Sequence, residues 1–169
     1  MELQAAVHAT DCVARYSPTF AVSVAGQLAT LVRSLLTPPD IKLKAVAALR
    51  HFHRSPETAR TALELGMQLL HEFSSQASVV VALKALAQIV VRSLVGVGPF
   101  MELLFARLET DPRHGVRAVA LGALHRLALH IPHLVLFWTF NKLGEKRDLF
   151  IFTCSYLVGS GCRRMCRGC

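Results

Sequence analysis

The chain has 169 residues, 53% of them hydrophobic but only 7% aromatic, and its formal net charge is +8. This length is enough for one compact domain with a hydrophobic core. A composition dominated by Ala, Leu and Val favours helices packed closely on helices over a β-sandwich. Because the basic residues of 1–131 are scattered singly, the net charge does not by itself define a nucleic-acid site.

The cysteine content and the N-terminal sequence further restrict the class of protein and the compartment in which we expect it. Cys12 is the only cysteine in the first 150 residues, which argues against a secreted disulfide framework and predicts a reducing compartment. The start, MELQAAVHAT, has neither the basic nor the apolar region of a signal peptide. The apolar runs at 134–140 and 149–158 are far shorter than the ~18 residues of a membrane span. We therefore expect no membrane contact.

Helical periodicity runs through residues 1–131. An apolar helix is expected within 5–14, and Ser17-Pro18 then supplies an N-cap and a proline for a helix over 17–36. One stripe of that helix should face the core: Phe20, Val24, Leu28, Leu31 and Leu35. Thr37-Pro38-Pro39 ends it, and Asp40 is expected to cap the next helix, Ile41–His53. Further helices are predicted over 55–73, 77–94 and 100–109, and Thr110-Asp111-Pro112 is expected to cap a last one that runs to about residue 130 and stops at Pro132.

An internal repeat joins these helices. The segments 45–52, 82–89 and 120–127 are similar, and their leucines Leu49, Leu86 and Leu124 lie 37 and 38 residues apart. A helix pair recurring about every 40 residues is typical of HEAT and armadillo solenoids. We predict an all-α HEAT/armadillo-like solenoid over 1–131. Its predicted units are a partial repeat at 1–16, which starts in the second helix of a repeat, and full repeats at about 17–54, 55–95 and 96–131.

Charged residues at the predicted turns have an expected structural role. In HEAT repeats an Asp at the turn inside a repeat and an Arg shortly after it commonly tie one turn to its neighbour. Asp111 and Arg117 fit this pattern, and Asp40 with Lys44 forms a weaker version of it. We predict that these residues stabilise the repeat turns.

Residues 132–169 differ in composition, because they hold Trp138, two Phe-rich runs and four of the five cysteines. We interpret them as a divergent, poorly defined tail, either a separate module or a sequence foreign to the solenoid. The candidate metal ligands are Cys154, Cys162, Cys166 and Cys169. The last three have the spacing of a radical SAM cluster loop, and all four together could hold zinc. No βα pattern follows them and Cys154 lies in an apolar run, so we expect no metal and no cofactor.

No catalytic arrangement is visible. Gly96 and Gly98 follow no strand, so they do not form a phosphate loop. His51 and His53 are two residues apart, which on a helix directs them to different faces and disfavours chelation. His130 and His133 flank Pro132 at a helix end. We therefore expect no enzyme activity and no small-molecule substrate.

Arginines near one predicted inter-helix turn are the candidate partner surface. They are Arg50, Arg54 and Arg60. They could meet an acidic protein or RNA phosphate, and the simpler interpretation is a solvated turn.

Two segments carry a family resemblance. Phe20–Ser55 and Thr110–His133 resemble the Integrator complex subunit 7 family. The resemblance rests on Thr37-Pro38-x-Asp40-x-Lys42-Leu43-Lys44, on the aromatic-His block before Ser55, on Asp111-Pro112-Arg113 with Val116, and on Ile131-Pro132-His133. It covers about residues 1–133, and the Cys-rich tail departs from it.

The resemblance implies a nuclear, non-catalytic scaffold that contacts other Integrator subunits. It implies a role in 3′-end processing of small nuclear RNA and in termination of transcription by RNA polymerase II. No catalytic residues transfer, and direct contact with RNA is without support. The alternatives are a HEAT-type adaptor elsewhere, such as a phosphatase scaffold or a transport receptor, and a metal-binding module that uses the tail.

Overall fold

The computed structural model describes residues 2–143, and no strand occurs within that range. The helices are α1 (Glu2–Tyr16), α2 (Pro18–Arg33), α3 (Pro39–Ala48), the short 3-10 helix η1 (Leu49–His51), α4 (Pro56–Glu72), α5 (Gln76–Ser93), α6 (Val97–Thr110), α7 (His114–His130) and α8 (Pro132–Leu143). The chain divides into two compact units, Met1–Ala123 and Leu124–Cys169. The predicted all-α class is confirmed.

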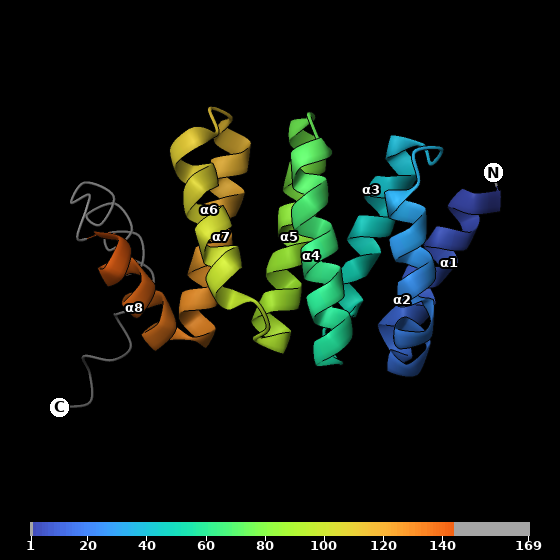
Figure 1. The fold of residues 1–169 in the computed structure, drawn as a ribbon, viewed down its shortest axis with the longest axis horizontal. Coiled ribbons are helices and arrows are strands. Elements are labelled where there is room, and N and C mark those ends of the chain that lie inside the picture. The colour runs from blue at the N-terminus through green and yellow to red at the C-terminus, as the bar shows by residue number, and fades with distance from the viewer. Residues whose placement is uncertain (1, 144–169) are drawn as a thin grey trace. The chain divides into compact units, whose positions relative to one another are not determined.

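The helices of the first unit pack in layers. Helix α2 contacts both α3 and α4, while α3 contacts α1 and α5, and α4 contacts α5. Helices α2/α3 and α4/α5 are therefore hairpins, with α2 and α4 in one layer and α1, α3 and α5 in the other. Figure 1 shows these hairpins side by side in chain order. This stacking is that of a helical solenoid, as the repeat predicts.

Serine side chains cap two of the helices, and one of these caps, Ser17, was predicted. Ser17 is the N-cap of α2, its Oγ accepts from the backbone N–H of Phe20 at 3.3 Å, and Pro18 is in the first turn. The Ser75 Oγ likewise accepts from the N–H of Ser78 at 3.2 Å at the start of α5. Each serine satisfies a backbone donor that the helix itself leaves without a partner.

The turn after α2 corrects two predictions. Helix α2 ends at Arg33, not at residue 36, so Leu35 is 95% exposed and does not join the core stripe. The N-cap of α3 is Pro38 and no side chain caps that helix, so Asp40 lies in its first turn without the expected role. The cause is a turn in which the Thr37 N–H donates to the Ser34 carbonyl at 3.4 Å, which ends the helical ladder early.

Helix α5 is the central element of the first unit. Lys84 and Arg92 of this helix are exposed, while eight of its residues are buried: Val79, Ala82, Leu83, Ala85, Leu86, Ala87, Ile89 and Val90. Among the described residues, α5 alone has the length and apolar content of a membrane span. Its packing against α3 and α4 accounts for that composition, since the helix buries apolar side chains against both neighbours. At Gly66 of α4 a Cβ atom would overlap the Leu86 side chain, so glycine permits the close α4–α5 approach.

The connection from α5 to α6 differs from its prediction. Leu94 ends α5 in the left-handed region (φ 58°), Gly96 follows with φ 66°, and α6 begins at Val97, three residues before the predicted start. A Cβ atom at Gly96 would overlap the Leu63 side chain, so both the backbone angle and the lack of space require glycine there.

In the second unit, the end of α7 is followed by α8. The Ile131 N–H donates to the Leu127 carbonyl, and the Val135 N–H donates to the Ile131 carbonyl. Pro132 thus ends one helix, as predicted, and begins another, which the sequence analysis missed. Proline is tolerated in a first helical turn because its missing N–H has no intrahelical partner there.

Candidate interaction surface

The turn between α6 and α7 is built around a buried carboxylate. The Asp111 side chain is 3% exposed, and its Oδ2 accepts from Arg113 Nη2 at 2.6 Å. Its Oδ1 accepts from Arg113 Nε at 2.8 Å and from the Arg113 backbone N–H at 3.0 Å. Arg107 Nη1 lies 3.7 Å from Oδ2. The hydrogen bonds from the Arg113 guanidinium hold the pKa of Asp111 down at about 2.

The two arginines of this cluster also reach the preceding hairpin. Arg113 Nη1 donates to the Ser74 carbonyl at 2.9 Å, and Arg107 Nη2 donates to the Leu70 carbonyl at 3.2 Å. Both acceptors lie at the end of α4 or in the α4–α5 turn. Asp111 therefore orients guanidinium groups that join one hairpin to the next, and we call these three side chains the Asp111 cluster.

The turn arginine that bonds to Asp111 is Arg113. Arg117 is exposed, and no contact between it and Asp111 is found in the described part of the chain. Arg113 takes this place because it lies in the turn itself, where its backbone N–H already bonds to the carboxylate. Asp40 and Lys44, the weaker predicted pair, are both exposed on α3.

A second acid-centred cluster joins α1 to η1. Arg50 Nη2 donates to Asp11 Oδ1 at 3.1 Å and to Oδ2 at 2.8 Å, while His51 Nε2 lies 3.1 Å from Oδ1. Arg50 was predicted to be part of a partner surface. Its guanidinium is paired with the Asp11 carboxylate, and the side chain is 37% exposed. We call Asp11, Arg50 and His51 the Asp11 cluster.

His51 is a titratable group inside this cluster. Burial lowers its pKa below the ordinary value, and the nearby Arg50 acts in the same direction, although the Asp11 carboxylate opposes both. His51 Nε2 lies 3.2 Å from Arg50 Nε and 3.1 Å from Asp11 Oδ1, so the proton on this nitrogen determines which of the two contacts is a hydrogen bond. Burial also lowers the pKa of His53, whose Nδ1 lies 3.1 Å from the Arg50 carbonyl.

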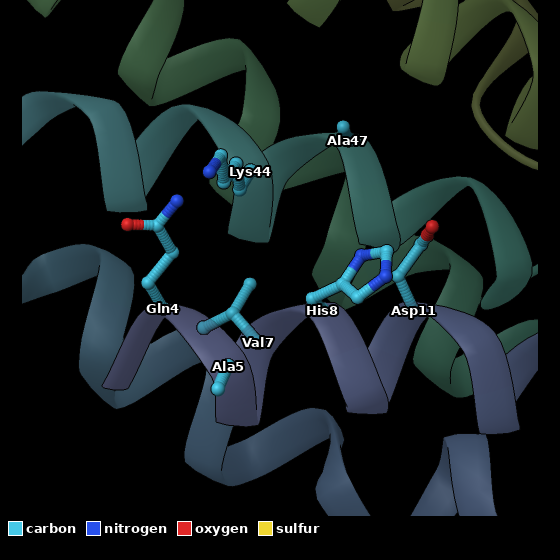
Figure 2. Close-up of a pocket in the computed structure, with 7 residues that line it drawn as sticks. All are labelled: Gln4, Ala5, Val7, His8, Asp11, Lys44 and Ala47. Atoms are coloured by element: carbon cyan, nitrogen blue, oxygen red, sulfur yellow. The ribbon is translucent and has the colours of Figure 1, made fainter. Parts of the chain in front are cut away.

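Beside the Asp11 cluster lies an open groove between α1 and α3. It has a volume of about 600 Å³ and is lined by Gln4, Ala5, Val7, His8, Asp11, Lys44 and Ala47. Figure 2 shows the Gln4 and Lys44 side chains at one part of the groove and His8 beside Asp11 at another. Three of the lining residues are apolar and four are polar or charged, so the groove is of mixed polarity.

The other predicted residues are placed as follows. Arg54 and Arg60 are exposed. The positive charges of Arg92 and Arg54 add to the effect of burial in lowering the pKa of His53. His130 Nδ1 lies 2.9 Å from the Arg126 carbonyl. Within residues 2–143 no three His, Cys, Asp or Glu side chains gather as metal ligands. Cys154, Cys162, Cys166 and Cys169 lie outside the described residues.

The helical hairpins are stacked, and side chains of one hairpin reach the next. This arrangement defines an α-solenoid, a class of protein whose surface can bind other macromolecules. The sequence profile described as "Integrator complex subunit 7, N-terminal" matches residues 1–151. The chain therefore belongs to the Integrator complex subunit 7 family. The match extends past residue 131, where the sequence analysis placed the end of the solenoid.

Curated relatives agree with the profile. The chain is 33% identical over 133 residues to Integrator complex subunit 7 of Homo sapiens and 32% identical over 133 residues to that of Gallus gallus. It is 34% identical over 128 residues to that of Drosophila melanogaster. These matches cover 79%, 79% and 76% of this chain. The chain spans only 13–14% of the length of these relatives.

Proposed function

We propose that this chain is a non-catalytic scaffold segment of the Integrator complex that binds other Integrator subunits through the surface of its helical repeats. The observation that carries this proposal is the family match over residues 1–151. The relatives are named as subunits of that complex. A solenoid of stacked hairpins is a common support for protein contacts, because its helices form one extended surface.

The proposal includes a place and a process. The chain acts in the nucleus, where it supports 3′-end processing of small nuclear RNA and termination of transcription by RNA polymerase II. Its contribution is to hold other subunits in position, and it takes no small-molecule substrate. The groove between α1 and α3 offers a binding surface of mixed polarity for such a contact.

Affinity purification of the tagged full chain from nuclear extract, with partners identified by mass spectrometry, tests the proposal. We expect enrichment of Integrator subunits. A matched variant, Leu83→Asp, places a charge at a fully buried position of α5 and should abolish recovery by unfolding the repeats. Equal recovery by both chains, or enrichment of a phosphatase or transport receptor instead of Integrator, would overturn the proposal.

A further inference from the structure

The turn between α2 and α3 presents a pair of leucines to solvent. Leu35 is 95% exposed and Leu36 is 94% exposed, whereas Leu94, in another turn of the first unit, is 58% exposed. Isolated apolar side chains on a protein surface are ordinary, but two adjacent leucines with almost no cover are not. Leaving both in water forgoes the hydrophobic stabilisation that burial of each would supply.

The turn is held in one conformation. The Thr37 N–H donates to the Ser34 carbonyl at 3.4 Å, and the Leu36 N–H donates to Ser34 Oγ at 3.3 Å. The Thr37 hydroxyl donates to the Leu31 carbonyl at 2.8 Å. Two prolines follow the turn and fix their own φ angles. The leucines are therefore presented by an ordered support.

Folding does not explain why these two positions are leucine. They are the central positions of a four-residue turn, which are most often occupied by Pro, Asp, Asn, Ser or Gly. Neither has a positive φ, since Leu94 is the one non-glycine residue with such an angle in the described part of the chain. Polar residues would satisfy this backbone equally well.

The corresponding turns of the next hairpins have no such pair. The α4–α5 turn contains Ser74 and Ser75, and the α6–α7 turn contains Asp111 and Arg113. These two turns are joined by the hydrogen bond from Arg113 to the Ser74 carbonyl. The leucine pair thus occupies a place where the neighbouring hairpins have polar residues that serve contacts within the chain.

From this geometry we propose that Leu35 and Leu36 anchor a partner protein by entering an apolar pocket whose rim is acidic. The inference rests on the proposed function, and it names a contact point for another subunit. The charges that flank the turn in the sequence favour an acidic rim, because residues 30–44 contain Arg33, Lys42 and Lys44 but only one acid, Asp40. A shaped protein pocket suits the turn better than a fluid lipid surface, since a turn already fixed in its binding conformation loses little entropy on docking.

The first test is affinity purification of the tagged full chain from nuclear extract, comparing the wild type with Leu35→Ser/Leu36→Ser. We expect recovery of at least one Integrator subunit to fall about 10-fold or more, because central apolar anchors carry most of the energy of an interface. The matched control is Leu94→Ser, which removes an exposed leucine from another turn and should leave recovery unchanged. Thermal unfolding of both variants should match that of the wild type, which excludes a folding defect.

The second test identifies the occupant. The photocrosslinker p-benzoylphenylalanine replaces Leu36 or, as a control, Leu94, and crosslinked peptides are mapped by mass spectrometry. We expect a crosslink from position 36, but not from position 94, to an Integrator peptide beside acidic residues. Sedimentation with phosphatidylcholine/phosphatidylserine vesicles provides the lipid comparison, and vesicle binding that the double serine variant loses would overturn the protein-pocket inference.

The two proposals can fail separately. If wild type and double serine variant recover the same Integrator subunits equally well, the anchor is wrong while the scaffold function stands. If position 36 crosslinks to an identified acidic, apolar pocket of a protein outside Integrator, the anchor is right while the scaffold function is wrong. If no subunit is recovered and no crosslink forms, both are wrong.

Discussion

The Asp111 and Asp11 clusters use the same spacing for different purposes. In each, an arginine reaches a group 39 residues earlier in the chain, which is close to one repeat. The Asp111 side chain is 3% exposed and orients arginines toward backbone carbonyls, while the Asp11 side chain is 26% exposed and binds side chains directly. Contacts one repeat period apart can therefore be either a buried structural tie or a solvent-facing ion pair. We expect the buried cluster to contribute more to the free energy of unfolding than the exposed one.

Removal of the buried carboxylate is the strongest test of this comparison. Asp111→Ala should lower the free energy of unfolding by about 2–3 kcal/mol, because two arginines would lose the acceptor that orients them at a buried position. Urea denaturation of the full chain measures this loss. Asp40→Ala, at an exposed acid of α3, is the control and should change stability by less than about 0.5 kcal/mol. Equal effects of the two substitutions would contradict the assignment.

The second test separates charge from geometry. Arg113→Lys keeps the positive charge beside Asp111 but cannot make the paired contacts with the carboxylate while also reaching the Ser74 carbonyl. We expect a loss of about 1–1.5 kcal/mol in the same urea experiment. Arg117→Lys, at an exposed position of α7, is the matched control and should leave the free energy of unfolding unchanged. An unchanged free energy of unfolding in Arg113→Lys would show that the several hydrogen bonds of the guanidinium do not contribute to stability.

The third test concerns the more exposed cluster. Asp11→Ala should cost about 1 kcal/mol or less, because water can replace the lost partner of Arg50. Glu64→Ala, at an exposed position of α4, provides the baseline. A loss as large as that from Asp111→Ala would show that exposure does not distinguish the two clusters.

The smallest effect is a pH dependence. Because the folded-state pKa of Asp111 is about 2 and the ordinary value is 3.8, its stabilisation is present above pH 4 and is lost as pH falls toward 2. His51 also has a lowered pKa, so the unfolded chain gains protons first and stability begins to fall below pH 6.5.

Urea denaturation between pH 7 and 5 checks the histidine part of that prediction. His51→Gln should reduce the slope of stability against pH without abolishing it, because the pKa of His53 is lowered as well. His125→Gln is the control variant. If it changed the slope of stability against pH as much as His51→Gln does, the pH dependence could not be assigned to His51. For the carboxylate, the stability difference between wild type and Asp111→Asn should shrink between pH 4 and 2.

Local sequence signals were sufficient for the fold class and for most helix boundaries. Apolar spacing, Ser17-Pro18 and the proline at 132 act on neighbouring residues, so they can be read without tertiary information. The apolar spacing continues to Leu35, so it predicts a helix that extends past Arg33. In the structure the hydrogen bonds of Thr37 to the Leu31 and Ser34 carbonyls form a turn that ends the helix earlier. Helix α8 was missed because Pro132 was interpreted only as a stop.

Contacts between repeats were harder to predict, because they depend on how hairpins stack. Arg117 fitted the expected motif, yet Arg113 lies where the guanidinium can reach both Asp111 and the preceding turn. The Asp11–Arg50 pair was missed although a signal existed, since applying the repeat period to charged residues as well as to leucines leads from Asp11 to about residue 50.

The ties to the preceding hairpin end on backbone oxygens, those of Leu70 and Ser74. Every amino acid provides such an oxygen, so this contact restricts the sequence of the later repeat only. The earlier hairpin can exchange its surface residues over evolution while the stacking persists. That asymmetry is one way in which a scaffold can keep its framework and still change the faces it offers to its partners.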